Sequence, residues 1–118
     1  MLFRSSDSPV PDAVKRLYLA AGLDGTVVTA QIDGVPHRVL RTRMVDRLIG
    51  GGGAGSGGAN TPVLLRAAMV EGRTDLGLMP AGQVAGLIED LPSCAELIAA
   101  IARDAEAGLD TMATFRSE

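Results

Sequence analysis

Cysteine, histidine and aromatic residues are scarce in this sequence of 118 residues, which contains one Cys, one His, one Tyr, two Phe and no Trp. A single cysteine excludes an internal disulfide framework and favours a reducing compartment, so we expect a cytoplasmic protein. The lone histidine and cysteine give no metal-ligand spacing, and no metal site is expected. Because 47% of the residues are hydrophobic but only 3% are aromatic, the core must be built mainly from aliphatic side chains.

The sequence also lacks an excess of positive charge and a long apolar run. Its formal net charge is −3, whereas nucleic-acid binding needs a basic surface, so nucleic acid is not an expected partner. No apolar run approaches the ~20 residues that a membrane-spanning helix needs. The N-terminus shows no apolar signal-peptide core. We therefore expect a soluble chain that does not contact a membrane.

The first predicted element is a helix that follows the loop ending at Pro11. Apolar residues at helical spacing would line one side of it, namely Val14, Leu17, Tyr18 and Ala21. Ser8 or Asp12 can cap its beginning, and Gly22 would end it.

A β-hairpin is predicted next, between Thr26 and Arg41. Thr26–Ile32 is rich in β-branched residues, Asp33-Gly34 signals a two-residue turn, and the chain returns over Val35–Leu40. Pro36 limits the return strand to the edge of a sheet.

Glycine then dominates Gly50–Asn60, after a short helix that Thr42 can cap. Gly53–Gly58 satisfies G-x-G-x-x-G, but that dinucleotide fingerprint needs a buried strand directly before it. The preceding residues, Asp46–Ile49, favour a helix instead. Because a tract so rich in glycine behaves as flexible coil, a linker is favoured over a phosphate-binding loop.

Three helices are predicted after the tract. Asn60 or Thr61 can cap the first, and a second would begin at Pro80. The third would begin with the capping box Ser93–Glu96 and present an apolar stripe to a neighbour. That stripe comprises Leu97, Ile98, Ile101, Ala105 and Leu109.

Two glycines of the second helix, Gly82 and Gly86, add no side chain to its surface. Each costs about 1 kcal/mol of helix propensity, so a reason for close approach is expected. Contact with a neighbouring backbone is favoured over contact with a flat cofactor or substrate.

No catalytic set emerges from these patterns. His37 has no Asp, Cys or second His arranged around it in the sequence, so a solvated or packed hairpin residue is favoured over a chemical role. Cys94 lies in the first turn of a helix, where a thiolate is stabilised, but without a nearby basic partner a small buried hydrophobe is favoured. Glu89 and Asp90 are adjacent and would point in different directions.

Several groups of residues resemble the C-terminal end of one flavin enzyme family. They are Gly72–Gly77, Ala81-Gly82-Gln83, Gly86–Asp90 with Pro92, and Ala95-Glu96-Leu97. Upstream, Ser8–Lys15 resembles the segment just after the last barrel strand of that family, and Asp24–Arg41 resembles the start of its smaller second domain. The family is that of the nitronate monooxygenases, also called 2-nitropropane dioxygenase-like proteins, with related NADH:quinone reductases. The likeness extends from about Phe3 to Leu109.

The resemblance implies a TIM barrel that carries FMN and an oxidoreductase reaction on a nitronate, or between NADH and a quinone. This chain would be α+β and mostly helical, comprising a small helical lid-type domain with a β-hairpin and the final helices of an incomplete TIM barrel. In the family, the phosphate-binding glycines lie at the ends of the late barrel strands and the catalytic histidine comes from an earlier strand, and the resemblance implies that this chain lacks both. His37 is therefore not the equivalent of that histidine and no catalytic residue is assigned, while Ala81, Gly82 and Gln83 are expected to face the flavin.

The expected domains follow from this resemblance. Residues 1–49 would form the post-barrel helix and hairpin of the second domain, 50–60 a linker, 61–109 the helical segment that closes the barrel, and 110–118 a tail. Without the barrel, exposed apolar stripes would favour a barrel-forming partner chain or self-association through Leu87, Ile88, Leu97 and Ile101.

Three functions remain open at this stage. The first is a C-terminal fragment or split half of the FMN enzyme, inactive without its barrel. The second is a non-catalytic helical interaction module derived from the family. The third, which has the least support, is a small enzyme that uses the glycine tract to bind a nucleotide.

Overall fold

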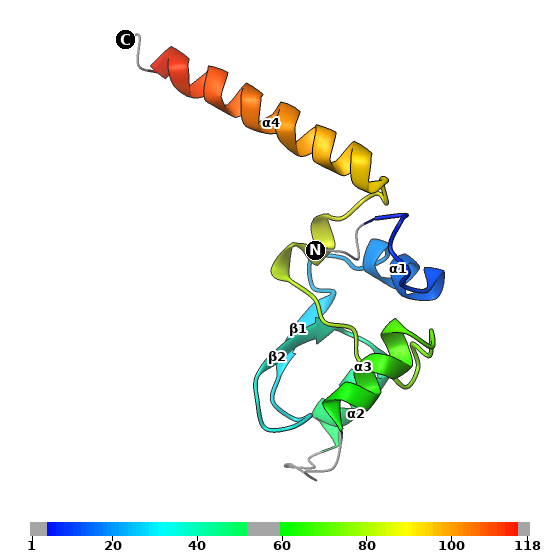
Figure 1. Cartoon of the computed structure of the whole chain (residues 1–118). Helices are drawn as coiled ribbons and strands as arrows, with labels where there is room; N and C mark the ends of the chain where they lie inside the picture. Colours follow the sequence, from blue (N-terminus) through cyan, green and yellow to red (C-terminus); the bar gives the residue numbers. More distant parts are fainter. Residues whose placement is uncertain (1–4, 52–59, 116–118) are drawn as a thin grey trace. The chain divides into compact units, whose positions relative to one another are not determined.

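The computed structural model describes residues 5–51 and 60–115 of the chain (Figure 1). They form two compact units. One is Pro9–Asp90, and the other consists of the described parts of Met1–Ser8 and Leu91–Glu118. The predicted fold, α+β and mostly helical with a β-hairpin, is confirmed: the described residues form four α-helices, one short 3-10 helix and one two-stranded sheet. Residues 1–4, 52–59 and 116–118 lie outside the described residues, and so does most of the predicted glycine linker at 50–60.

Helix α1, Asp12–Leu19, starts the larger unit. Pro11 precedes it without a side-chain cap, so the prediction that Ser8 or Asp12 caps the helix is wrong. The carbonyl of Pro11 accepts from the N–H groups of Val14 and Lys15, and Asp12 instead occupies the first turn. Of the residues predicted to line one side of the helix, Val14 and Tyr18 are buried, whereas Leu17 is exposed and Ala21 lies beyond the helix. The helix ends at Leu19 with Ala20 as its C-cap, so the prediction that Gly22 ends it is wrong.

The hairpin pairs β1, Thr26–Thr29, with β2, His37–Leu40, in antiparallel register. Residues 30–36 connect the strands, so the predicted two-residue turn at Asp33-Gly34 is wrong. The strand register excludes that turn, because the pairing of Thr29 with His37 centres the connection on Asp33 and not between Asp33 and Gly34. Ile32, which is 2% exposed, joins the core from this loop. Gly34 takes a φ of +86°, a conformation that favours glycine.

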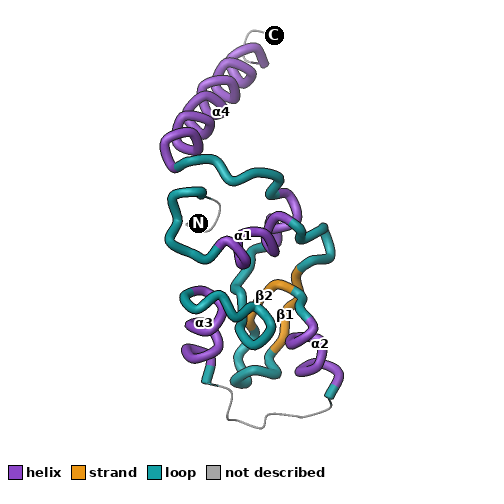
Figure 2. The backbone as a smooth tube through the Cα atoms, turned by 90° about the vertical axis from the view of Figure 1, so that its right-hand side faces the viewer, coloured by secondary structure: helices purple, strands orange, loops and turns teal. Residues whose placement is uncertain are grey.

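Two capped helices pack on the hairpin. Thr42 precedes α2, Arg43–Gly50, and its hydroxyl accepts from the N–H of Val45, while Asn60 caps α3, Thr61–Met69, in the same way. Both caps confirm the sequence prediction. Side chains from both helices pack with the hairpin in one core, whose buried members are Ile32, Val39, Val45 and Leu78. Figure 2 shows α3 and α2 on either side of the strands.

The chain on either side of the glycine tract therefore shares a single core, because Val45 precedes the tract whereas Leu64 and Leu65 follow it. The predicted division into a second domain (1–49) and a barrel-closing segment (61–109) concerns the full enzyme, and it stays a prediction.

An extended segment follows α3 and pairs with the free edge of β2. The N–H of Leu40 donates to the carbonyl of Met79 at 2.8 Å, and the N–H of Ala81 donates to Arg38 at 3.1 Å. Pro80 thus forms a bridge opposite Val39 rather than the first turn of an α-helix, and that prediction is wrong. Proline fits here because an edge strand does not require its missing N–H.

Only a short 3-10 helix, Gln83–Leu87, follows this segment. Its buried side chain is Ala85, whereas Val84 and Leu87 are exposed. This short helix therefore buries its smallest apolar side chain and leaves the two larger ones at the surface.

Helix α4, Cys94–Phe115, belongs to the second unit. Its predicted capping box is confirmed: the carboxylate of Glu96 accepts from the Ser93 N–H at 2.8 Å, and the Ser93 hydroxyl accepts from the Glu96 N–H at 3.3 Å. The helix continues to Phe115, through most of the segment predicted to be a frayed tail. Among the described residues, no helix has both the length and the apolar character needed to cross a membrane.

Candidate functional site

The segment from Met79 to Gln83 contains the residues predicted to face a flavin. Its beginning is fixed by the two backbone hydrogen bonds to β2 and by the phenol of Tyr18, which donates to the carbonyl of Pro80. Burial raises the pKa of Tyr18 to about 12, so the phenol keeps its proton and its role as donor throughout the neutral range. Two elements of the larger unit, β2 and α1, therefore hold this segment in place.

The three predicted cofactor residues are accessible to different degrees. Ala81 is half-buried, while Gly82 and Gln83 are exposed. A Cβ at Gly82 would meet only Val84, at 3.9 Å, so the space beside this glycine is open. Gln83 has no side-chain hydrogen bond to another described residue, which leaves its amide available to a ligand. Whether these three residues contact a flavin stays a prediction.

The space beside Gly86 is closed, unlike the space beside Gly82. A Cβ there would lie 2.5 Å from the carbonyl oxygen of Gly22, far closer than a real contact allows. Its missing side chain therefore serves packing against the backbone of the turn after α1, the reading that the sequence favoured. Gly82, in contrast, meets no neighbouring backbone.

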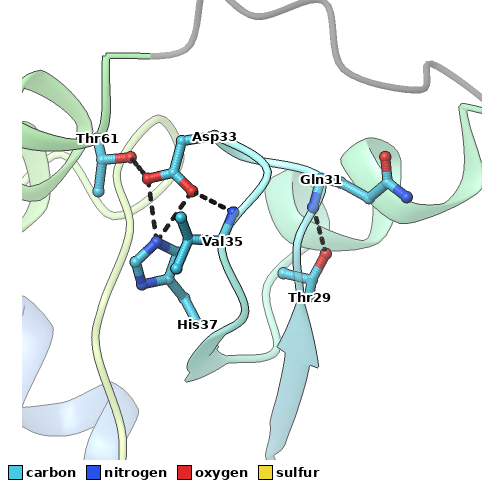
Figure 3. A network of polar contacts seen from close by, with 6 residues as sticks. All are labelled: Thr29, Gln31, Asp33, Val35, His37 and Thr61. Carbon is cyan, nitrogen blue, oxygen red and sulfur yellow. Dashed lines mark hydrogen bonds and ion pairs between the residues drawn. The ribbon is translucent and has the colours of Figure 1, made fainter.

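A polar network joins the hairpin loop to the beginning of α3 (Figure 3). The carboxylate of Asp33 accepts from the Thr61 hydroxyl at 2.7 Å and from the Val35 N–H at 3.0 Å. Both carboxylate oxygens lie 3.0 Å from Nε2 of His37. Thr61 first, then Val35 and His37, lower the pKa of Asp33 to about 2.

The sequence analysis missed this network, and its statement that no acid is arranged around His37 is wrong. Asp33 lies four residues earlier, and the long loop brings its carboxylate to the imidazole. Among the described residues Asp33 is the one recorded partner of His37. Through the Thr61 hydroxyl, the Asp33–His37 pair links the hairpin loop to the beginning of α3.

A small hollow of about 100 Å³ lies beside the network. His37 and Thr61 line it together with apolar residues, including Leu65, Leu78 and Pro80. Pro80 belongs to the same extended segment as Ala81. The hollow is thus mainly apolar, with one polar wall.

Cys94 is exposed, so the prediction of a buried hydrophobe is wrong. Its thiol lies 3.2 Å from the hydroxyl of Ser5, and its N–H donates to the carboxylate of Asp7 at 2.7 Å. The N-terminal segment therefore lies at the beginning of α4 and leaves the cysteine at the surface. In the described part of the chain, no group of three His, Cys, Asp or Glu residues could hold a metal ion.

These elements define an α+β chain that corresponds to part of a TIM-barrel protein. The chain matches the family model described as "Nitronate monooxygenase" over residues 1–104. It belongs to the nitronate monooxygenase family, which confirms the resemblance predicted from the sequence.

Two curated relatives carry a dehydrogenase name, (3aS,4S,5R,7aS)-5-hydroxy-7a-methyl-1-oxo-octahydro-1H-indene-4-carboxyl-CoA dehydrogenase. The protein from Mycobacterium tuberculosis is 43% identical over 91% of this chain and 42% of its own length. The protein from Rhodococcus jostii is 35% identical over 96% of this chain and 44% of its own length. The chain thus spans less than half the length of these relatives.

Among solved structures, FabK from Thermotoga maritima superposes with a TM-score of 0.82 and 28% sequence identity. The match covers 95% of this chain and 37% of that protein. The chain therefore shares the fold of the corresponding part of that protein.

The alignment with the M. tuberculosis relative extends over 148 residues, although this chain has 118. The relative therefore has internal residues without a counterpart here, in addition to everything outside the alignment. The chain is thus shorter than the corresponding part of that relative.

Proposed function

We propose that this chain is one part of an FMN-dependent oxidoreductase that dehydrogenates a CoA thioester, and that it is inactive without a barrel supplied by further polypeptide. The observation that carries the proposal is the 43% identity to the M. tuberculosis dehydrogenase, over a match that spans 42% of that protein. A similarity at this level over nearly the whole chain supports a shared reaction class better than the family description alone.

The residues proposed to meet the cofactor are Ala81, Gly82 and Gln83. The open space at Gly82 and the free amide of Gln83 fit a flat ring with hydrogen-bonding edges. Bound FMN would supply the redox chemistry. The chain's own contribution would be to cover one side of the flavin, exclude water from it and hold Gln83 in position through the anchored segment at Pro80.

The experiment is reconstitution of the whole site. This chain would be co-purified with the part of the M. tuberculosis relative that lies outside the alignment, and the visible flavin spectrum would be recorded after removal of free FMN. We expect a retained flavin band, and oxidation of an alicyclic hydroxyacyl-CoA by the complex but not by either part alone. No flavin retention in any combination would contradict the proposal.

A matched pair of variants tests the assigned residues. The chain has only two glutamines, and both are exposed. Gln83→Ala should lower flavin retention in the complex, whereas Gln31→Ala, in the hairpin loop, should not. Equal flavin retention by both variants would show that Gln83 does not contact the flavin. It would not contradict the proposed reaction class.

Nitronate oxidation, or NADH:quinone reduction, is the second candidate reaction, and the family description favours it. Turnover of a nitronate to carbonyl compound and nitrite, without turnover of the CoA thioester, would select it. A non-catalytic helical interaction module is a further candidate function, and the exposed apolar face of α4 supports it. That module would bind a partner without retaining flavin.

A further inference from the structure

Positive charge is concentrated in one short segment of this acidic chain. Of the 11 lysines and arginines, four lie between Arg38 and Arg47, together with a single acid, Asp46. The segment covers β2, the residues after it and most of α2. A local excess of positive charge in a chain with a net charge of −3 needs a structural or functional reason.

Structure explains only half of this group. Arg38 donates to the Thr26 hydroxyl at 3.0 Å, and Arg41 donates to Asp46 at 3.2 Å. Arg43 and Arg47 are exposed, and within 5–51 and 60–115 neither has a recorded hydrogen bond or ion pair.

Arg43 and Arg47 are four residues apart on α2, so their positive charges lie close together. Residues four apart on a helix are neighbours, with about 5–6 Å between their Cβ atoms, and like charges at this spacing destabilise the helix slightly. Arg43 and Arg47 therefore present two adjacent guanidinium groups on one face of α2 at a small cost to the fold. An anion with more than one charge would relieve that repulsion.

A hollow of about 170 Å³ adjoins the beginning of α2. Leu17, residues 20–22 and Gly25, from α1 and the turn after it, line the hollow together with Leu40, Arg41 and Thr42. Most of these side chains are small or apolar, and Arg41 is the arginine of the group that lines the hollow. Arg43 follows Thr42 in the chain as the first residue of α2.

We infer that this hollow, together with Arg43 and Arg47 of the helix α2 that begins beside it, binds the phosphorylated nucleotide end of a CoA thioester. The inference rests on the proposed function, because the CoA thioester is the substrate class named for the curated relatives. CoA joins an apolar-faced adenine to a 3′-phosphate and a diphosphate, so it needs a small-residue surface beside several cations. Arginine suits this role because its planar guanidinium donates two parallel hydrogen bonds to a phosphate.

Two carboxylates near the same region, Asp46 and Asp24, reduce its net positive charge. Asp46 is already paired with Arg41, and Asp24 lies in the turn between Gly22 and Gly25. The two unpaired arginines still outnumber the one unpaired acid. The phosphates would therefore contact α2, and the adenine would lie on the side of the turn.

The experiment measures binding of CoA to the purified 118-residue chain by calorimetry, with 3′-dephospho-CoA and inorganic phosphate as comparison ligands. The double variant Arg43→Gln/Arg47→Gln should weaken CoA binding about tenfold or more, since hydrogen bonds to charged groups are the strong ones. It should also bind CoA and dephospho-CoA equally, and with a smaller dependence on salt. The control Arg66→Gln/Arg73→Gln removes the same charge from α3 and the residues after it, and should keep wild-type affinity.

Three results would overturn the inference: no CoA binding by the wild-type chain, equal affinity of the wild type and the α2 variant, or inorganic phosphate competing as well as CoA does. Circular dichroism of each variant confirms that α2 is intact. The proposed function fails separately, when the reconstituted complex does not oxidise the thioester. If CoA binding still depended on Arg43 and Arg47, the hollow would be a nucleotide-binding site in a protein that does not oxidise the thioester.

Discussion

At the scale of single residues, Gly86 is the position where one methyl group should do most harm. A Cβ there would lie 2.5 Å from the carbonyl oxygen of Gly22, and backbone cannot move aside as a flexible side chain can. We expect Gly86→Ala to lower the free energy of unfolding by about 1–3 kcal/mol, the usual range for overpacking. Chemical denaturation measures the change.

The control for this prediction lies in the same short stretch. Gly82 has a φ of −91°, which alanine tolerates, and its Cβ would meet only Val84 at 3.9 Å. Gly82→Ala should therefore leave stability nearly unchanged. A similar loss in both variants would show that helix geometry, and not the contact with Gly22, sets the requirement at Gly86.

Asp33 makes a prediction about acid stability. Its pKa falls from an ordinary value of 3.8 to about 2 in the folded chain, first because of the Thr61 hydroxyl. A carboxyl with a lowered folded pKa stabilises the fold above its unfolded pKa and loses this contribution as the pH falls through its folded pKa. The wild type should therefore lose stability between about pH 4 and pH 2 in a way that Asp33→Asn does not.

The decisive readout is the carboxyl titration by NMR. Thr61→Val removes the largest cause of the shift and should return the pKa of Asp33 part of the way toward its ordinary value. An unchanged titration in this variant would place the cause elsewhere. The hydrogen bond between Thr61 and Asp33 is also the one recorded side-chain link from the hairpin loop to the beginning of α3 among the described residues, so the same variant tests how α3 is anchored.

At the scale of elements, α4 depends on its first turn. Its residues after Cys94 are mostly exposed, so little packing supports the helix, and its N-terminal cap matters more than usual. Ser93→Ala removes the hydroxyl that accepts from the Glu96 N–H and should cost about 1 kcal/mol of helix stability. Far-ultraviolet circular dichroism during thermal unfolding measures this loss.

Thr111→Ala is the comparison within the same helix. Its hydroxyl donates to the carbonyl of Ala107, an interaction internal to the helix, and alanine has the higher helix propensity. This variant should keep or raise the helix content. A loss equal to that of Ser93→Ala would argue against a special role for the cap.

At the scale of the whole molecule, exposed apolar side chains predict association. Ile98, Ile101, Leu109 and Met112 are 67%, 60%, 71% and 67% exposed, and their spacing places them on one face of α4. Of the four residues first predicted to mediate contacts, Leu87 and Ile101 are exposed, while Ile88 and Leu97 are half-buried. We propose that the face of α4 binds a second copy of the chain, or the barrel part of the enzyme when that is present.

Light scattering over a range of concentrations tests this proposal. Ile101→Glu places a charge in the apolar face and should shift the chain toward the monomer. Ala107→Glu adds the same charge on the opposite side of α4 and should not. A wild-type chain that stays monomeric and binds no hydrophobic dye would contradict the proposal.

The sequence by itself determined the features that depend on local interactions. The caps at Thr42, Asn60 and Ser93, the existence of the hairpin and the family were all predicted correctly, because each depends on residues close in the chain or on a specific motif. These signals do not require knowledge of what lies opposite in space.

Tertiary structure decided the rest. Pro80 pairs with the edge of β2 and does not start a helix, because backbone hydrogen bonds to a distant strand outweigh a local preference. The loop of residues 30–36 buries Ile32 and brings Asp33 to His37 and Thr61. Such contacts join residues whose separation in sequence gives no periodic signal, so the network and the hollow beside α2 became visible only when the chain was folded.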